Sequence, residues 1–310
     1  MSKDSPFKES KIPVLDSVVE LEKFIVRFPD FKFCLYLAFK NEADWEKSTS
    51  RVYMNQTLPR FLYIPVNIVK EDYRSLSQLY AYVNEKPQIV AINQTQPHKS
   101  NPVLMDLFKD LPGLPTNVDA LVKDKSGNLL PYDLNGPSFV GWFNDEIGTF
   151  TAKTVVLVGI GGVGEPIARR LIQDKPKKLI LVDPVDKQLL AQEIARVGSV
   201  EYVSNLNQLA ITQDDELILL NAAGKEGVGD DSGVISLLQS KKGTQAIFVD
   251  LRPQLDIDIV KLAQELGWQA YTGFGMNARN DYALIEKIAA LIGEAPPIFD
   301  KFQVLVENAS

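Results

Sequence analysis

The sequence predicts an α/β fold of two domains: an N-terminal α/β substrate domain and a C-terminal domain built on a doubly wound parallel sheet. Two observations predict it. The chain has 310 residues, more than an average single domain holds. In its second half, short continuous apolar runs alternate with stretches of helical periodicity, which is typical of parallel strands covered by helices on both faces.

The first half mixes the two element types. Residues 15–28 have the apolar spacing of a helix, and several apolar runs have the length of strands. The last two runs are joined through Lys125-Ser126-Gly127, which is typical of a hairpin. The expected strands are Phe31–Phe39, Phe61–Val69, Gln88–Thr95, Val118–Asp124 and Asn128–Leu134.

The second half is expected to begin near Asn135-Gly136, which divides the chain into domains 1–135 and 136–277. The final helices, Ala278–Ile292 and Pro297–Ala309, could pack on either domain. The expected strands of this half are Thr154–Val158, Leu179–Val182, Glu216–Leu220, Ala246–Asp250 and Gln269–Thr272, and its expected helices include Val163–Ile172 and Gln188–Val197.

Composition excludes several classes of function. The net charge of −7 argues against a nucleic-acid or anionic membrane partner, and no apolar run is long enough to span a bilayer. The single cysteine, Cys34, is expected to be a buried core thiol, as in a cytoplasmic protein. The single histidine, His98, excludes a His-rich metal site, and we expect no metal. The sequence fits a monomer or a homodimer.

A glycine motif predicts a dinucleotide site. Gly159, Gly161 and Gly164 form GxGxxG within Gly159-Ile160-Gly161-Gly162-Val163-Gly164, directly after an expected strand and before an expected helix. The glycines allow a tight turn, close approach of the backbone to a pyrophosphate, and close packing of helix on strand, as in the Rossmann fold. Asp183 ends the next strand, where a carboxylate binds ribose hydroxyls and repels a 2′-phosphate. We therefore expect NAD as cofactor, with NADP less favoured; the alternative is a glycine-rich turn that binds nothing.

Short segments spread over about residues 30 to 290 resemble, in order, the motifs of the shikimate dehydrogenase family. Lys47-Ser48-Thr49-Ser50 with Asn55 resembles HSxSPxxHN, Asn93–Lys99 resembles NVTIPHK, Val118–Val122 resembles VNTLV, and Tyr132–Gly136 resembles YNTDG. Asn221-Ala222-Ala223 resembles NAT, and Gly273–Met276 resembles GLGM, followed by Asn280 at a glutamine position.

The resemblance implies an activity: reversible, NAD(P)-dependent oxidation of a ring hydroxyl of shikimate, quinate or a related cyclic hydroxy acid, as in aromatic amino acid biosynthesis. It implies that Ser48 and Ser50 hold the substrate carboxylate and that Lys99 carries the proton to and from the reacting oxygen. It assigns the remaining substrate contacts to Asn93, Thr95, Asp119 and Asn280, and further cofactor contacts to Asn221, Gly275 and Met276. His98 is expected to be structural.

The sequence departs from the family pattern where the family has a catalytic aspartate, since Asn135 stands at the aspartate of NTDG. We therefore expect Lys99 to lack its carboxylate partner, with Asp133 able to replace it only if the backbone bulges. Asp119-Ala120 also replaces the family's NT, and Asp250-Leu251-Arg252-Pro253 lacks the tyrosine of DxxYNP. These changes favour an altered ring subsite, or the alternative of a catalytically silent NAD-binding regulatory module.

Overall fold

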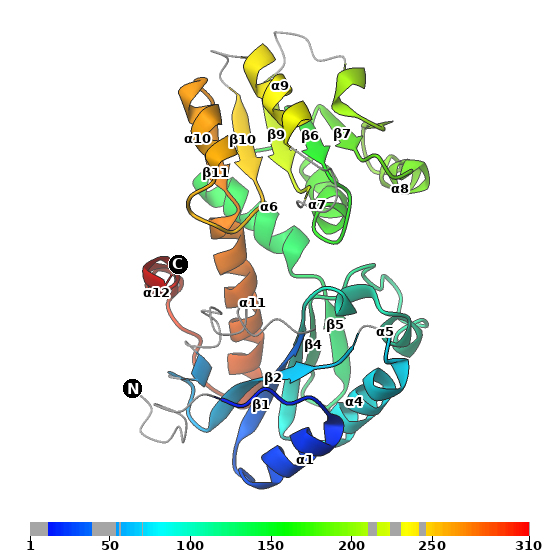
Figure 1. The fold of residues 1–310 in the computed structure, drawn as a ribbon, viewed down its shortest axis with the longest axis vertical. Helices are drawn as coiled ribbons and strands as arrows, with labels where there is room; N and C mark the ends of the chain where they lie inside the picture. The colour runs from blue at the N-terminus through cyan, green and yellow to red at the C-terminus, as the bar shows by residue number, and fades with distance from the viewer. Residues whose placement is uncertain are drawn as a thin grey trace. The chain divides into compact units, whose positions relative to one another are not determined.

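The computed structural model describes residues 12–38, 54–55, 57–69, 71–209, 216–223, 231–241 and 246–309, with side chains through residue 304. The chain divides into two compact units, which Figure 1 shows with their elements labelled. Unit 1 comprises residues 1–134 and 281–310, and unit 2 comprises residues 135–280. The structure thus assigns the final helical residues from Asp281 onward to unit 1.

Unit 1 is built on a five-stranded mixed sheet in the order β2-β1-β3-β4-β5. The strands β1, β2 and β3 pair in parallel, whereas β4 and β5 add an antiparallel hairpin. Their bounds are β1 Lys32–Ala38, β2 Phe61–Asn67, β3 Ile89–Gln94, β4 Ala120–Lys123 and β5 Leu129–Tyr132. The helices are α1 Val18–Val26, α4 Tyr73–Glu85, the 3-10 helix η1 His98–Ser100, α5 Pro102–Leu107 and α12 Phe299–Ala309.

The central strands of this sheet are buried on both faces because their side chains are apolar along their length. Leu35, Ile64 and Ile92 are fully buried in one core cluster, and α1 and α4 pack beside each other on the unit. Cys34 is also fully buried, as expected from its apolar run. Burial strongly raises the pKa of the Cys34 thiol, so it stays protonated at neutral pH.

Unit 2 is a doubly wound parallel sheet in the order β11-β10-β9-β6-β7-β8. Counted along the chain, this is 6-5-4-1-2-3, the Rossmann order, and the predicted fold class is confirmed. Its strands are β6 Thr154–Val158, β7 Lys178–Val182, β8 Val200–Val203, β9 Leu217–Asn221, β10 Ile247–Asp250 and β11 Gln269–Thr272. Its helical elements are α6 Asn135–Glu146, α7 Gly164–Leu171, η2 Ile172–Asp174, α8 Gln188–Ile194, η3 Leu206–Gln208, α9 Ser232–Ser240, α10 Asp258–Glu265 and the first part of α11 Phe274–Ile292.

One local expectation was wrong. The run 128–134 does not stay extended to its end: β5 stops at Tyr132, and Asn135 is the first residue of α6. His98 and Lys99 lie in the 3-10 turn η1, after β3.

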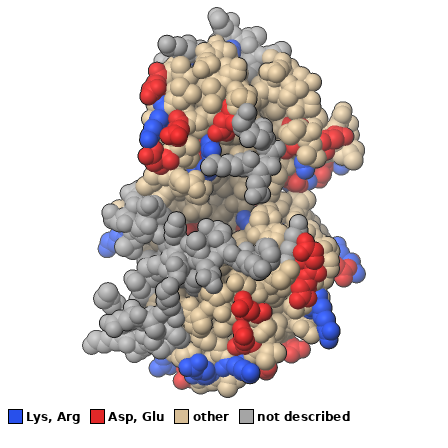
Figure 2. All heavy atoms as spheres, viewed as in Figure 1, with Lys and Arg blue, Asp and Glu red and all other residues tan. Residues whose placement is uncertain are grey.

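No helix among the described residues is long and apolar enough to cross a bilayer. On the face drawn in Figure 2, acidic and basic side chains are interspersed rather than gathered by sign.

Candidate active site and dinucleotide cradle

Lys99 forms an ion pair with Asp119. The Lys99 Nζ lies 2.5 Å from Asp119 Oδ1, and the side chains are 17% and 3% exposed. The other carboxylate oxygen, Oδ2, accepts a hydrogen bond of 2.7 Å from the backbone N–H of Leu134. The expectation that Lys99 lacks a carboxylate partner was therefore wrong, and the partner is Asp119, which the motif comparison had placed among the substrate contacts.

A buried hydrogen-bond chain holds the turn that carries Lys99. The Asn101 side chain donates to the His98 carbonyl and to the Tyr80 hydroxyl, which in turn donates to Gln94 Oε1 at 2.7 Å. Asn101 also caps α5 by accepting from Leu104 N–H. Sequence reasoning missed Tyr80, Gln94 and Asn101, although Asn101-Pro102 is a typical helix start.

The Lys99 backbone is also tied to the residues just before β4, because its carbonyl accepts from Val118 N–H at 2.8 Å. His98 beside it is fully buried, next to the backbone of Ile68 and Ala38. Burial lowers the pKa of His98, which favours the neutral ring. Lys99 is therefore fixed at its main chain while its ammonium stays partly exposed.

Two predicted substrate contacts lie at the end of β3. The Asn93 amide donates to the Tyr63 hydroxyl at 2.6 Å, and the Thr95 hydroxyl donates to the Leu37 carbonyl at 3.2 Å. Both side chains are partly buried. Burial raises the pKa of the Tyr63 hydroxyl, so Tyr63 is a neutral partner for Asn93.

Ser48 and Ser50 lie outside the described residues. Asn55, in the same motif, makes a two-way contact with β2: its amide donates to the Tyr63 carbonyl and its oxygen accepts from Tyr63 N–H. Asn55 thus anchors the chain five residues after Ser50.

The glycine loop has the geometry that the motif predicts. Gly159 has φ +85°, and a Cβ there would lie 2.7 Å from the backbone nitrogen of Ala223. A Cβ on Gly164 would lie 1.9 Å from the Gly159 carbonyl oxygen, whereas one on Gly161 would meet nothing within 4 Å. The first and third glycines therefore permit the tight turn and the close packing, and the second leaves open space beside the backbone.

The loop lies after β6, which neighbours β9 where the strand order reverses, the usual ligand crevice of this fold. The helix α7 begins at Gly164, and its positive N-terminal end faces the loop; the N–H groups of Glu165 and Ile167 donate to the carbonyls of Gly161 and Val163, so an anion would bind the N–H groups of the loop itself. Ile160 is fully buried, and Gly162 and Val163 complete the turn into the helix. The residues present therefore fit the pyrophosphate of a dinucleotide.

Asp183 closes this loop. Its Oδ2 accepts from Ile160 N–H at 2.6 Å and its Oδ1 accepts from Val185 N–H at 2.9 Å, with the residue 8% exposed. Each carboxylate oxygen can accept more than one hydrogen bond, so capacity for a ribose hydroxyl remains. Asp183 thus has a structural part in the loop that sequence reasoning missed.

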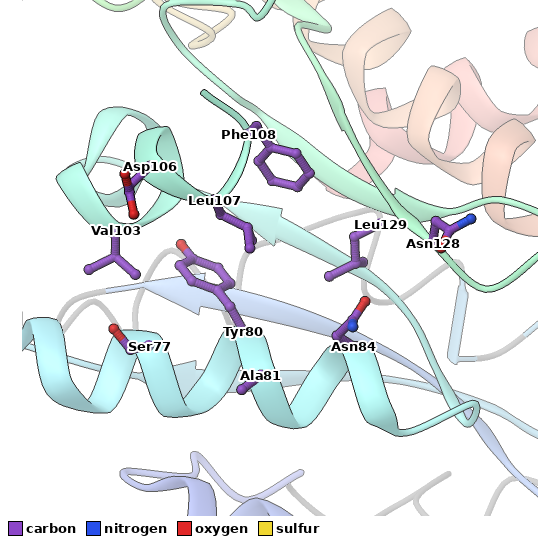
Figure 3. A pocket seen from close by; sticks show the side chains of 10 residues that line it. All are labelled: Ser77, Tyr80, Ala81, Asn84, Val103, Asp106, Leu107, Phe108, Asn128 and Leu129. Carbon is purple, nitrogen blue, oxygen red and sulfur yellow. The ribbon is translucent and has the colours of Figure 1, made fainter. Parts of the chain in front are cut away.

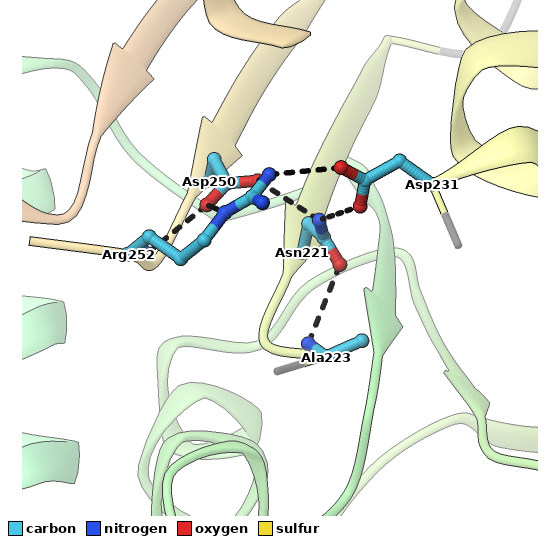
Figure 4. A network of polar contacts seen from close by, with 5 residues as sticks. All are labelled: Asn221, Ala223, Asp231, Asp250 and Arg252. Atoms are coloured by element: carbon cyan, nitrogen blue, oxygen red, sulfur yellow. Dashed lines mark hydrogen bonds and ion pairs between the residues drawn. The ribbon is translucent and has the colours of Figure 1, made fainter. Parts of the chain in front are cut away.

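Asn221 belongs to a buried polar network at the ends of β9 and β10 (Figure 4). Its amide nitrogen donates to Asp250 Oδ2 at 2.9 Å and Asp231 Oδ1 at 3.4 Å, and its oxygen accepts from Ala223 N–H at 3.3 Å. Arg252 binds both oxygens of the fully buried Asp250 at 2.7 Å. Hydrogen bonding to Asp250 raises the pKa of Arg252 further above its usual value. Asn221 is 1% exposed, and its amide holds the strand ends together.

The remaining predicted residues lie around the start of α6 and α11. Asn280 donates to Asn135 Oδ1 at 2.8 Å, so these two predicted residues are in contact. A Cβ on Gly275 would lie 2.1 Å from Trp142 Nε1, and Met276 is 5% exposed within the unit 2 core. Gly275 thus allows α11 to pack closely on the indole of α6.

A separate cavity of about 450 Å³ lies in unit 1 beside α4 and α5. As Figure 3 shows, Tyr80, Leu107, Phe108 and Leu129 point into it, with Asn84 and Asn128 at one end. Lys99 and Asp119 are not among its lining residues. No group of three potential metal-binding side chains occurs within the described ranges.

Comparison with known proteins gives one curated relative of interest. The chain is 27% identical over 155 residues to the shikimate dehydrogenase (NADP(+)) of Carboxydothermus hydrogenoformans. The aligned segment covers 49% of this chain and 53% of that protein. The match thus spans about half the length of the relative. No protein-family model matches the chain.

Solved structures match nearly the whole chain. The quinate dehydrogenase of Corynebacterium glutamicum in complex with NAD superposes with a TM-score of 0.68 at 16% identity, over 90% of this chain and 99% of that one. The 5-ketofructose reductase of Gluconobacter sp. strain CHM43 superposes with a TM-score of 0.65 at 17% identity, over 90% and 99%. At such identity these structures show the fold. With the curated relative, they confirm that this chain resembles the shikimate dehydrogenase family in sequence and shares its fold.

Proposed function

We propose that this chain is an NAD(P)-dependent dehydrogenase that reversibly oxidises a ring hydroxyl of shikimate, quinate or a related cyclic hydroxy acid. The observation that carries the proposal is the partly exposed Lys99 ammonium paired with the buried Asp119, in a chain whose other unit fits a dinucleotide. A curated shikimate dehydrogenase relative and a quinate dehydrogenase of the same fold support the substrate class.

A bound nicotinamide dinucleotide would supply or accept the hydride. Gly161 and the N-terminus of α7 would hold its pyrophosphate, and Asp183 its ribose hydroxyls. Gly275 and Met276 remain candidates for the nicotinamide end, and Asn221 for positioning the strand ends beside it.

Lys99 would handle the proton. Its ammonium donates to the substrate oxygen during reduction, and its amine accepts from the hydroxyl during oxidation. Ser48 and Ser50 would hold the substrate carboxylate, while Asn93, Thr95 and Asn280 contact the ring, each by the family resemblance. Asn135 cannot take up a proton, so proton transfer falls to Lys99.

For the cofactor we propose a preference for NAD over NADP. Asp183 carries a negative charge at the end of β7, which opposes a 2′-phosphate. The curated relative uses NADP(+), whereas the quinate dehydrogenase was solved with NAD, so relatives of both kinds exist. The single, buried Cys34 supports a reducing, cytoplasmic location.

The test is a dehydrogenase assay at alkaline pH with NAD⁺ and NADP⁺ against shikimate, quinate and a small panel of cyclic hydroxy acids. Lys99→Ala should reduce kcat by about 100-fold or more, because positioned proton transfer contributes at least that much. The matched control is Lys109→Ala, since Lys109 is 64% exposed and pairs with Asp106 in a surface turn.

Turnover that is unchanged in Lys99→Ala would refute the assignment of Lys99. Tight dinucleotide binding without turnover of any substrate would instead favour a catalytically silent NAD-binding regulatory module.

A further inference from the structure

Two departures from the family pattern exchange the same pair of residues. At position 119 this chain has aspartate where the family has asparagine, and at position 135 it has asparagine where the family has aspartate. Taken one at a time, each change suggests a damaged site. Taken together they keep one carboxylate and one amide, and move the carboxylate from one motif to the other.

We propose that Asp119 is the carboxylate partner of Lys99 in catalysis, in place of the aspartate that the family has at position 135. The inference rests on the proposed function and deepens it. Asp119 acts on the reaction through Lys99, so it is a positioning residue that also sets the charge of the proton carrier.

The position of Asp119 is fixed from several sides. Its N–H donates to the Tyr132 carbonyl and its carbonyl accepts from Gln94 N–H, both at 2.8 Å, which places it between β3 and β5 at the start of β4. The Leu134 N–H binds Oδ2 at 2.7 Å and leaves Oδ1 directed at Lys99. A carboxylate held in this way is preorganised for a cation.

Both ends of the ion pair are held by one backbone link, because Val118 N–H donates to the Lys99 carbonyl. The residue before Asp119 therefore fixes the main chain of Lys99, while Asp119 fixes its ammonium. Asp119 is the charged group recorded in contact with that ammonium among the described residues. An asparagine at 119 would keep the shape and the Leu134 contact but would lose the charge.

Asp119 remains an ionised carboxylate throughout the proposed reaction. In the reducing direction the Nζ–H bond of Lys99 breaks and an O–H bond forms on the substrate, whose carbon receives the hydride of the reduced dinucleotide. Lys99 is left as a neutral amine and then takes a proton from water. Asp119 favours this return because a carboxylate at 2.5 Å stabilises the ammonium.

The test measures the charge state of Lys99 directly. A pulse of acetic anhydride at a series of pH values acetylates neutral amines, and mass spectrometry reports the extent at Lys99. In Asp119→Asn, acetylation of Lys99 should set in at lower pH than in the wild type, because the ammonium loses the carboxylate in contact with it. The pH at which oxidation reaches half its maximal rate should move in the same direction.

Two controls separate charge from structure. Lys109 in the same sample should keep its acetylation profile, and Asp133→Asn should leave the Lys99 profile unchanged. Asp119→Asn retains an acceptor for Leu134 N–H, so its thermal unfolding should stay close to wild type; if it does not, Asp119→Glu offers a second variant that keeps the charge.

An acetylation profile of Lys99 that is unmoved by Asp119→Asn would overturn the inference even if the enzyme is active. A shifted profile in a protein that oxidises no panel substrate would leave the pairing intact and refute the dehydrogenase instead. The two proposals therefore fail on different readouts.

Discussion

Each unit has a buried aspartate beside a strand end that binds a partly exposed cation. The two cations differ in how many hydrogen bonds hold them. Asp250 in unit 2 binds Arg252 through both oxygens, and the guanidinium also reaches Asp231. Asp119 in unit 1 gives one oxygen to Lys99 and the other to a backbone N–H. Lys99 directs one of its three donors to Asp119, whereas Arg252 directs three of its five to Asp250 and Asp231, so the guanidinium is held at more points than the ammonium.

The difference separates a pair that stabilises a fold from a pair suited to chemistry. Arg252 and Asn221 both bind Asp250 and so tie β9 to β10 (Figure 4). Lys99 has a fixed main chain, an ionic partner in Asp119 and a side chain that is 17% exposed.

Arg252→Met should destabilise the protein by about 3 kcal/mol, because it leaves the fully buried Asp250 carboxylate without its cation. Lys99→Met should cost less than half as much, since Lys99 makes one ionic hydrogen bond where Arg252 makes several. Urea unfolding followed by circular dichroism measures both. Equal losses would remove the proposed distinction between the two pairs.

Gly164→Ala should destabilise unit 2 by about 1–3 kcal/mol and abolish dinucleotide binding, because the new Cβ would overlap the Gly159 carbonyl. Gly161→Ala is the matched control for stability, since its Cβ would meet open space. We expect Gly161→Ala to melt like wild type and to bind dinucleotide more weakly. Undiminished binding by Gly161→Ala in a fluorescence titration would place the pyrophosphate elsewhere.

Asp183→Asn should raise the affinity for NADP⁺ relative to NAD⁺, because it removes the negative charge while keeping an acceptor for the loop. Asp183→Ala should weaken both cofactors, since the Ile160 N–H would lose its partner at a cost of about 1–3 kcal/mol. Isothermal titration of both variants with both dinucleotides makes the comparison. An unchanged NADP⁺ to NAD⁺ ratio in Asp183→Asn would contradict the role of Asp183 in selectivity.

His98 should make stability fall modestly below neutral pH. Burial lowers its pKa in the folded state below the ordinary value of 6.5, so the unfolded chain binds the proton first. The stability due to the neutral ring is therefore present above pH 6.5 and is lost as the pH falls from there to the folded pKa. Proton NMR can follow this single imidazole, and His98→Leu should flatten the slope of the unfolding free energy against pH below 6.5. A wild-type slope retained in His98→Leu would assign the effect to other groups.

Many strands and helices could be predicted because the spacing of apolar residues indicates which side of an element is buried. The strand Thr154–Val158 has the predicted bounds, and the glycine loop follows it as the motif requires. The strand Val200–Val203 was missed because it lies at the sheet edge and is half exposed, so its short sequence lacks a continuous apolar run. The helix α4 was missed although Leu76, Leu79, Tyr80 and Val83 have helical spacing behind the cap Asp72.

The site was predicted less completely because pairing across strands depends on tertiary structure. Lys99 was found from its motif, but its partner lies 20 residues away across the β3–β4 register. The turn that carries Lys99 is a 3-10 helix held by Tyr80 and Asn101. The contact between Tyr80 and Asn101 joins residues far apart in the chain, so the sequence around Lys99 does not predict it. The one signal in the sequence was the simultaneous presence of Asp119 and Asn135 where the family has the reverse.

The most direct test of the account is a crystal structure of the protein with NAD⁺ and either shikimate or quinate bound. The account predicts that the pyrophosphate lies on Gly161 and the first turn of α7, and that Lys99 Nζ binds a ring hydroxyl while keeping its contact with Asp119. A ring bound with its hydroxyls away from Lys99, or an Asp119 that has released Lys99 to bind the substrate itself, would contradict it.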